Sequence, residues 1–299
     1  MFALHTMASS LPSFVWLNGT ILPSAEVRIS PFDHGLLVGD GAFETLISYH
    51  GVPFAHARHW ERLRHSCETL GIATPPAGEI LRGMLATMAA NQMPNARVRV
   101  TVTSGEGPLG SDKGNHPPTV IIACSELKPW PETDTLVTVP WPRNERSALV
   151  GVKSISYAEN VRALAFAKSK GSGEALFANM RGDLCEGTGS NIFLVMGDAV
   201  ITPPLSSGCL AGVTRGLVVE LCQRHGMSIT ERPISMSEIQ ACDEAFLTST
   251  TREVQAVSRI DDHPIPLAPG PVTARLRVLF KEMAAEMVAL EAGNPTATS

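Results

Sequence analysis

Lys153 and Glu186 carry the two side chains of this chain that are best placed to do covalent and acid-base chemistry. Lys153 follows the apolar run at residues 148–152, which predicts a strand that carries the amine toward the interior. Burial lowers the pKa of an amine and makes it competent to form an imine with an aldehyde. The alternative for Lys153 is an ammonium group that extends from the strand end into solvent.

Glu186 opens the Gly-rich segment 186–193, which reads Glu-Gly-Thr-Gly-Ser-Asn-Ile-Phe. An acidic residue in such a turn is commonly solvated, and that reading stays open for Glu186 taken alone. Together with an imine-forming amine, however, a carboxylate could keep the ring nitrogen of an aromatic cofactor protonated, so that the ring accepts electrons. The pair therefore favours an enzyme that uses an aldehyde cofactor.

Two further features could bind anions. Gly212, Val213 and Thr214 open a predicted helix, and the free amides at a helix N-terminus favour a phosphate, although this is also an ordinary helix start. In the segment 97–104, Arg97 and Arg99 alternate with valines and lie on one face of a predicted strand. We expect at least Arg99 to bind a substrate carboxylate; the alternative is a solvated sheet face paired with acids.

Periodicity and turn residues predict mixed α and β structure. Expected strands are 14–18, 26–29, 43–49, 97–104, 119–123, 174–178, 191–196, 199–202 and 244–248, and expected helices are 56–70, 78–92, 158–170, 213–225 and 273–291. From these elements we expect a loose tail at 1–12, a small α/β domain at 13–127, a linker at 128–134 around Pro129 and Pro131, and a larger domain at 135–299.

Composition narrows the function classes. The chain has 299 residues and a formal net charge of -5, with no Lys/Arg-rich block that would favour nucleic acid. Its six cysteines form no Cys-x-x-Cys pair or Cys/His cluster, so neither a metal site nor a disulfide framework is indicated. No apolar stretch reaches bilayer-spanning length. We expect a cytoplasmic protein without a nucleic-acid or membrane partner.

Several ordered motifs closely resemble the class IV, or fold-type IV, pyridoxal-phosphate-dependent aminotransferases. They are the Lys-Ser-Ile-Ser-Tyr segment 153–157, the segment 186–193, the Leu-Ala-Gly-Val-Thr-Arg segment 210–215, the segments 31–45 and 59–63, and the segment 243–250. The resemblance implies a two-domain fold like that of D-amino acid aminotransferase, pyridoxal 5'-phosphate (PLP) bound between the domains, and a homodimer or larger assembly.

The resemblance also implies roles for individual residues. Lys153 would hold the cofactor as an imine and move the substrate proton, and Glu186 would face the pyridine nitrogen. Tyr157 would lie near the phenolic oxygen, unless it packs against the helix, and Leu210 would pack on the ring face. The phosphate would be bound by the amides of Val213 and Thr214, the hydroxyl of Thr250 and the charge of Arg62, which could equally be a surface arginine.

At the positions expected to bind the substrate, this chain carries different residues from the better-known relatives. Phe43 stands where D-amino acid enzymes carry a tyrosine, and the loop after Gly105 lacks their Arg-x-His carboxylate trap. Val38 and Arg97 stand where branched-chain enzymes usually carry tyrosines. By the resemblance the substrate-binding candidates are Val38, Phe43, Arg97, Arg99 and Thr251.

The expected activity is transfer of an amino group between an amino acid and a 2-oxo acid. The alternative is an aminodeoxychorismate lyase that releases 4-aminobenzoate and pyruvate, because such lyases share the lysine and resemble the segment 30–35. A third possibility is a protein that binds PLP without turnover.

Overall fold

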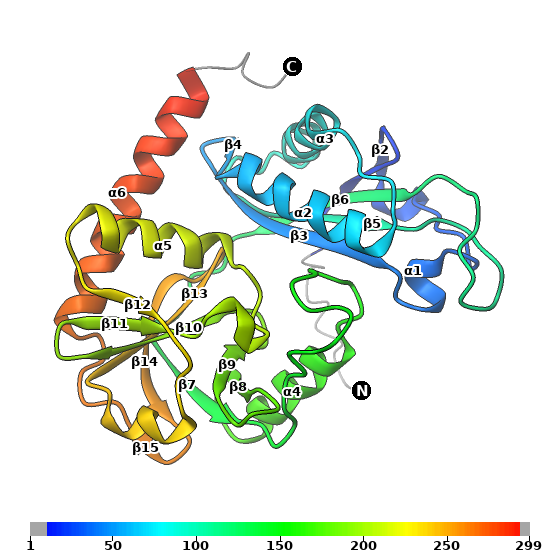
Figure 1. Ribbon diagram of the computed structural model, residues 1–299. Helices are drawn as coiled ribbons and strands as arrows, with labels where there is room; N and C mark the ends of the chain where they lie inside the picture. Colours follow the sequence, from blue (N-terminus) through cyan, green and yellow to red (C-terminus); the bar gives the residue numbers. More distant parts are fainter. Residues whose placement is uncertain (1–10, 294–299) are drawn as a thin grey trace, which may run out of the picture. The chain divides into compact units, whose positions relative to one another are not determined.

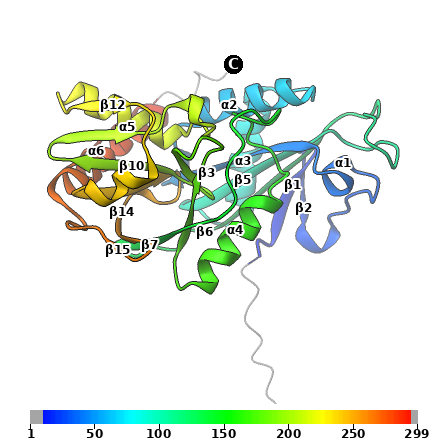
Figure 2. The ribbon, with the colours of Figure 1, turned by 60° about the horizontal axis from the view of Figure 1, so that its bottom comes forward.

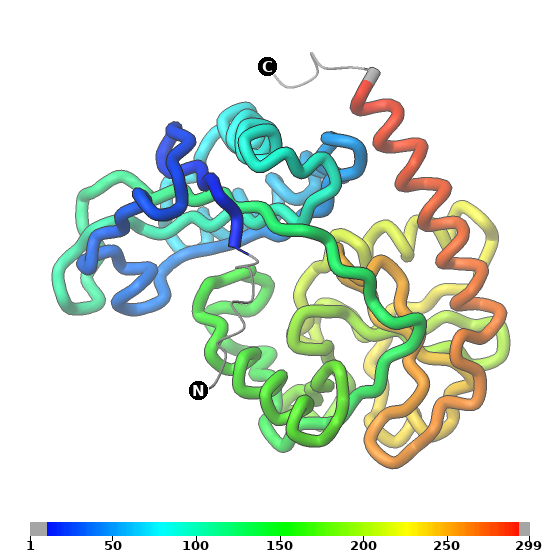
Figure 3. The backbone as a smooth tube through the Cα atoms, turned by 180° about the vertical axis from the view of Figure 1, so that it is seen from behind, coloured from blue at the N-terminus to red at the C-terminus, as the bar shows by residue number. Residues whose placement is uncertain are grey.

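The computed structural model describes residues 11–293, so residues 1–10 of the expected tail lie outside the described residues. Within this range the chain divides into two compact units. Unit 1 comprises residues 11–128 and 290–293, and unit 2 comprises residues 129–289. An extended connection at residues 127–132 leads from the last strand of unit 1 to the first strand of unit 2 (Figure 3).

Unit 1 contains an antiparallel sheet of order β2-β1-β6-β5-β3-β4. Its strands are β1 (Phe14–Leu17), β2 (Thr20–Pro23), β3 (Gly41–Tyr49), β4 (Val52–Pro53), β5 (Ala96–Thr103) and β6 (Thr119–Glu126). Its helices are η1 (Ser24–Glu26), α1 (His34–Leu37), α2 (His56–Leu70) and α3 (Ala77–Ala90). The expected strand at 26–29 is wrong, because the hairpin returns through β2 instead and the chain then forms the short turn η1.

Helices α2 and α3 cover one face of this sheet (Figure 1). The alternation of β5 explains the arrangement, since Val98, Val100 and Val102 are fully buried in the helix-covered core. Arg97 and Arg99 consequently lie on the opposite face. Helix α2 ends at Leu70, and its C-cap Gly71 adopts the left-handed conformation that favours glycine.

Unit 2 contains a mixed sheet of order β12-β11-β10-β13-β14-β7-β8-β9, with β15 paired to β14. Its strands are β7 (Thr133–Thr138), β8 (Glu174–Ala178), β9 (Leu184–Gly187), β10 (Asn191–Met196), β11 (Ala199–Thr202), β12 (Ile229–Glu231), β13 (Glu244–Ser249), β14 (Glu253–Ile260) and β15 (His263–Pro264). Its helices are α4 (Ala158–Ser169), η2 (Leu205–Ser207), α5 (Val213–Arg224), η3 (Met236–Ala241) and α6 (Pro271–Gly293), whose last residues count with unit 1.

Buried apolar strands form the core of unit 2. The rings of Phe193 and Phe246, on neighbouring strands, stack with their centroids 4.8 Å apart. Helix α4 packs against β8, and α5 packs against β13 and also against β12, beside which it lies in Figure 2. The expected mixed α/β class is confirmed. Among the described residues, no helix is both long and apolar enough to cross a bilayer.

Candidate active site

Lys153 lies after a turn and not after a strand. The expected strand at 148–152 is wrong, because Gly151 has a φ of +77° and two turn hydrogen bonds curl the segment. The amide of Val150 donates to the Ser147 carbonyl and the amide of Val152 donates to the Leu149 carbonyl, each at 3.1 Å. Lys153 is nevertheless half-buried, and its charge is close enough to act on the carboxyl group of Glu186.

Glu186 lies on β9, opposite Phe177 of β8, and 13% of its side chain is exposed. Its Oε2 accepts a hydrogen bond from the Leu210 amide at 2.9 Å, and its Oε1 lies 3.5 Å from Nε of Arg143. Burial raises the pKa of the Glu186 carboxyl group above its usual value, while Arg143, the Leu210 amide and Lys153 act in the opposite direction. The group is therefore poised to respond to a further positive charge.

The backbone of Leu210 is fixed from both sides. Its amide donates to Glu186, and its carbonyl accepts from Nδ2 of Asn191 at 2.9 Å. The same carbonyl accepts from the Gly212 amide at 2.8 Å. The segment that leads into α5 is thus attached to Glu186 and Asn191 of the Gly-rich segment 186–193.

Helix α5 begins at Val213, with Gly212 as its N-cap and no side chain capping it. The first amides of a helix have no carbonyl partner within the helix, so those of Val213 and Thr214 remain available to an anion. Asn191 lies so close that a Cβ on Gly212 would be 2.0 Å from Oδ1 of Asn191. Glycine is therefore required where the chain turns into this helix.

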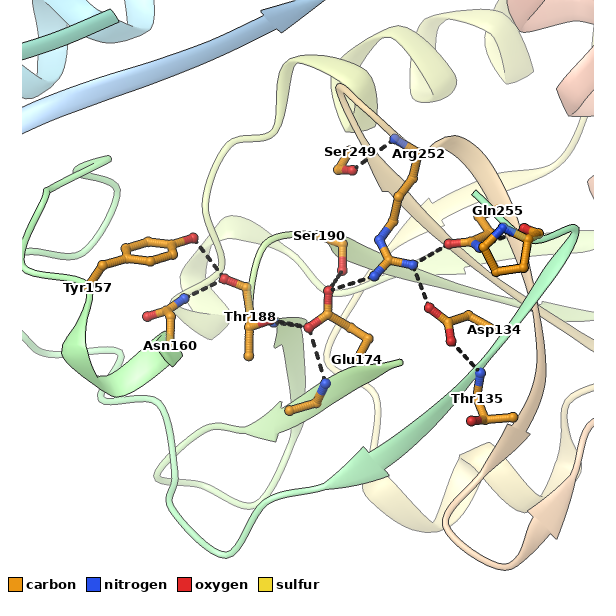
Figure 4. A network of polar contacts seen from close by, with 12 residues as sticks. Asp134, Thr135, Tyr157, Asn160, Glu174, Thr188, Ser190, Ser249, Arg252 and Gln255 are labelled. Carbon is orange, nitrogen blue, oxygen red and sulfur yellow. Dashed lines mark hydrogen bonds and ion pairs between the residues drawn. The ribbon is translucent and has the colours of Figure 1, made fainter. Parts of the chain in front are cut away.

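Tyr157 is the N-cap residue of α4, four positions after Lys153. Its hydroxyl donates to the Thr188 carbonyl at 2.8 Å, and the same carbonyl accepts from Nδ2 of Asn160 (Figure 4). Thr250 and Thr251 lie half-buried in the turn between β13 and β14. Just before that turn, Oγ1 of Thr248 is buried without a hydrogen-bond partner.

Unit 1 holds the remaining candidates. Nε and Nη2 of Arg62 donate to the two carboxylate oxygens of Glu44, at 2.7 and 2.8 Å. Nδ1 of His59 lies 2.7 Å from the same carboxylate. Burial alone would raise the pKa of Glu44, but the charges and hydrogen bonds of Arg62 and His59 outweigh it and hold that pKa well below its usual value.

Arg99 and Phe43 lie together on the sheet face opposite to Glu44. The guanidinium carbon of Arg99 is 3.8 Å from the centroid of the Phe43 ring, and its Nε donates to Oγ1 of Thr101 at 3.2 Å. Arg97 is on the same face but exposed, and Val38, also exposed, ends α1. The structure thus brings Arg99 and Phe43 together, whereas Arg62 is held from the other face of β3.

Sequence reasoning missed four residues that contact the candidate site: Arg143, Asn191, Glu174 and Arg252. Asn191 could have been noticed because it belongs to the Gly-rich segment. Arg143 contacts Glu186 and also lies over the Phe177 ring, 4.2 Å from its centroid. No local pattern marks Arg143, Glu174 or Arg252, since the charged groups that they contact are far away in the sequence.

Two known proteins are similar to this chain over most of its length. A branched-chain-amino-acid aminotransferase of Methanocaldococcus jannaschii, so named provisionally, is 34% identical over 275 residues, covering 90% of this chain and 96% of that protein. An aminodeoxychorismate lyase of Bacillus subtilis is 30% identical over 284 residues, covering 92% and 96%.

A solved structure has the same fold. It is the branched-chain amino acid aminotransferase of Thermobaculum terrenum in its PLP-form, which superposes with a TM-score of 0.85 at 26% identity over 93% of this chain and 96% of that one. The sequence profile of the class IV aminotransferases matches residues 41–260, well over half of the chain. The chain therefore belongs to the class IV aminotransferase family.

Proposed function

We propose that this protein transfers an amino group between an amino acid and a 2-oxo acid, with PLP as its cofactor. The observation that carries the proposal is the setting of Glu186 in unit 2, where its carboxyl group accepts from the Leu210 amide that leads into α5 and the charge of Lys153 acts on it. Class IV aminotransferases depend on PLP, and the Thermobaculum terrenum relative was solved in its PLP-form. The residues present fit the same cofactor.

The donor set of unit 2 matches the three ends of PLP. We assign the aldehyde to the amine of Lys153, the pyridine nitrogen to the carboxylate of Glu186, and the phosphate to the amides of Val213 and Thr214. Because burial raises the pKa of Glu186, a protonated ring nitrogen beside it would relieve the desolvation of the carboxylate. When bound, PLP holds the substrate amino group and draws electrons into its ring.

The chain's own residues perform the remaining steps. Nζ of Lys153 would hold the cofactor through its aldehyde carbon and would take the proton from the substrate α-carbon. Leu210, fixed by Glu186 and Asn191, would support the ring face. Tyr157 and Thr250 are assigned to the phenolic oxygen and the phosphate, and Arg62 to the phosphate charge; these three assignments rest on the family resemblance.

Arg99 is the residue that we assign to the substrate carboxylate. Stacking on Phe43 holds the guanidinium plane of Arg99, which suits the bidentate recognition of a carboxylate. Arg97, Val38, Phe43 and Thr251 remain proposed substrate contacts on the strength of the resemblance. We also propose a homodimer, as the resemblance implies, and a cytoplasmic location, which the six cysteines without a Cys-x-x-Cys pair favour.

The alternative is an aminodeoxychorismate lyase, which the similarity to the Bacillus subtilis enzyme of that name favours. Both activities need Lys153 and Glu186, so the cofactor residues do not separate them. The two activities differ in the substrates that they need. Transamination needs a 2-oxo acid acceptor to complete the cycle, whereas the elimination releases pyruvate without an acceptor.

The experiment has two stages. The protein is first incubated with PLP, reduced with borohydride, digested and weighed, and we expect a pyridoxyl adduct on Lys153 and none in Lys153→Ala. An adduct elsewhere contradicts the assignment. The protein with PLP is then mixed with L- and D-amino acids and, separately, with aminodeoxychorismate, while visible absorbance, 2-oxo acid and pyruvate are followed.

Each second-stage outcome selects one function. Conversion of the bound cofactor to pyridoxamine phosphate by an amino acid, reversed by a 2-oxo acid, supports the transaminase. Pyruvate released from aminodeoxychorismate without an acceptor supports the lyase. No response to the panel, despite the adduct on Lys153, leaves a protein that binds PLP without turnover.

A further inference from the structure

Thr188, two residues after Glu186, is held by hydrogen bonds at each of its polar groups. Its carbonyl accepts from Tyr157 and Asn160, and its amide donates to Oε1 of Glu174 at 3.1 Å. Its hydroxyl donates to the same Glu174 oxygen. Because Thr188 directly follows β9, which carries Glu186 and ends at Gly187, the bonds that hold Thr188 also restrict movement of Glu186.

Glu174 connects this turn to a second one. Its side chain is 4% exposed, and its Oε2 accepts from Oγ of Ser190 at 3.3 Å and lies 3.4 Å from Nη2 of Arg252. Arg252 is the last residue of the turn that carries Thr250 and Thr251. One buried carboxylate therefore contacts both the segment that follows Glu186 and the turn that we assign to the phosphate.

Arg252 is held as firmly as Glu174 (Figure 4). Its side chain is 4% exposed, its Nη1 donates to Oδ2 of Asp134 at 2.6 Å and also to Gln255, and its guanidinium carbon lies 3.8 Å from the centroid of the Trp130 ring. A buried guanidinium between two carboxylates has few alternative arrangements, because any other would leave a charge unpaired.

We propose that Arg252 and Glu174 are positioning residues for the cofactor. Through Glu174, Arg252 ties the Thr250–Thr251 turn to Thr188, and Thr188 in turn is bonded to the start of α4, four to seven residues after Lys153. The network therefore links the three segments assigned to the phosphate, the ring nitrogen and the aldehyde. This inference rests on the proposed function, since it concerns the same PLP site.

The test measures cofactor affinity and not turnover. Apoprotein is titrated with PLP, with pyridoxal, which lacks the phosphate, and with inorganic phosphate as a competitor, and thermal unfolding of each apoprotein is recorded. We expect Arg252→Met and Glu174→Gln each to raise the PLP dissociation constant about tenfold, as a coupling of roughly 1.4 kcal/mol would. The double variant should be no weaker than the weaker single variant, because both remove the same link.

A matched control is available in the same unit. Glu244 is also a buried carboxylate that accepts backbone amides, those of Val272 and Thr273 at 2.9 and 2.8 Å, where α6 begins. Glu244→Gln should lower the unfolding temperature but leave the PLP dissociation constant unchanged. Arg252→Lys keeps the charge but not the full set of guanidinium bonds, and it should bind PLP with intermediate affinity.

The outcomes separate this inference from the proposed function. If the wild-type apoprotein does not bind PLP, the proposed function fails. If the wild type binds PLP and Arg252→Met and Glu174→Gln bind it equally well, the positioning role is wrong. The role is also wrong if Glu244→Gln loses as much affinity as they do, because the effect would then follow general destabilisation.

Discussion

The amide of Leu210 donates to Oε2 of Glu186 at 2.9 Å, so one carboxylate oxygen is fixed by the backbone that leads into α5. The other oxygen lies at a longer distance, 3.5 Å, from Nε of Arg143. A carboxylate fixed through one oxygen presents the other in a defined direction, which is what recognition of a protonated ring nitrogen needs. This relationship makes Glu186 the residue on which the proposed chemistry depends most after Lys153.

Glu186→Gln should slow the amino-acid half-reaction markedly. Glutamine can still accept the Leu210 amide but carries no charge for the ring nitrogen, and a charge-assisted hydrogen bond contributes roughly 1.5–3 kcal/mol, or about a ten- to hundredfold change in rate. The measurement is single-turnover absorbance with a preferred amino donor. Glu186→Asp, which keeps the charge, should retain more activity, and an unchanged rate in the glutamine variant would contradict the assignment.

The same substitution should reveal the raised pKa of Glu186 in the apoprotein. Since the folded protein holds this proton more tightly than the unfolded chain does, ionisation destabilises the fold as the pH rises from about 4.5 through the raised value. Urea unfolding of apo Glu186→Gln should therefore show a stability that improves relative to wild type over that range. A difference that does not vary with pH would show that the Glu186 pKa is not raised.

The contribution of Glu44 to stability should depend on pH in the opposite direction to that of Glu186. Burial opposes its ionisation, but Arg62 and His59 outweigh burial and lower its pKa, so its contribution to stability is present above about pH 4.5 and is lost as the pH falls below that value. At neutral pH, Glu44→Gln should lower the free energy of unfolding by about 3 kcal/mol, because it removes the buried negative charge that faces Arg62. The urea-unfolding difference from wild type should shrink in acid.

The control for Glu44 is Glu61→Gln, on the helix that carries Arg62. Glu61 pairs with Arg64 at an exposed site, and exposed ion pairs contribute little to stability. We expect no measurable change in unfolding for Glu61→Gln. Equal destabilisation by the two substitutions would mean that the burial of Glu44 does not determine its effect.

Local sequence predicted the elements whose signals are local. Strands β8, β10 and β11 match the expected bounds because apolar runs and turn residues delimit them, and α2 ends at Leu70 as expected. The strand predicted at 148–152 was wrong. Its apolar residues are typical of a strand, but Gly151 has a positive φ and turns the chain. The expected strand at 26–29 failed because β1 had already paired with β2.

The residues of the candidate site also fall into those that local sequence marks and those that it does not. Lys153, Glu186 and the start of α5 belong to short motifs, so sequence alone could single them out. The residues that fix them could not be found this way. Glu174 and Arg252 are 78 residues apart, and Arg252 and Asp134 are 118 apart, so only the order of β14, β7 and β8 in the sheet brings them together.

Arg99→Ala should weaken the binding of the amino-acid substrate while leaving PLP affinity unchanged. If Arg99 binds the carboxylate, the loss of roughly 1.5–3 kcal/mol corresponds to about a ten- to hundredfold rise in apparent substrate dissociation constant. Arg97→Ala is the comparison, and it should weaken substrate binding less than Arg99→Ala does, since Arg97 lies on the same strand face but is exposed. An unchanged apparent affinity in Arg99→Ala would remove the assignment.

Gly212→Ala should disturb the phosphate end of the proposed site. The new Cβ would lie 2.0 Å from Oδ1 of Asn191, which is buried and already bonded to the Leu210 carbonyl through its Nδ2, so either the asparagine or the start of α5 must shift. We expect weaker binding of PLP and of competing inorganic phosphate, measured by titration of the apoprotein.

Gly216→Ala in the same helix is the matched control for Gly212→Ala, because its Cβ would meet nothing within 4 Å, and alanine should stabilise that position by about 0.5–1 kcal/mol. Combining Asn191→Ala with Gly212→Ala removes the clashing oxygen, so the double variant should bind PLP no more weakly than the weaker single variant; additive losses would show that the collision with Asn191 is not the cause.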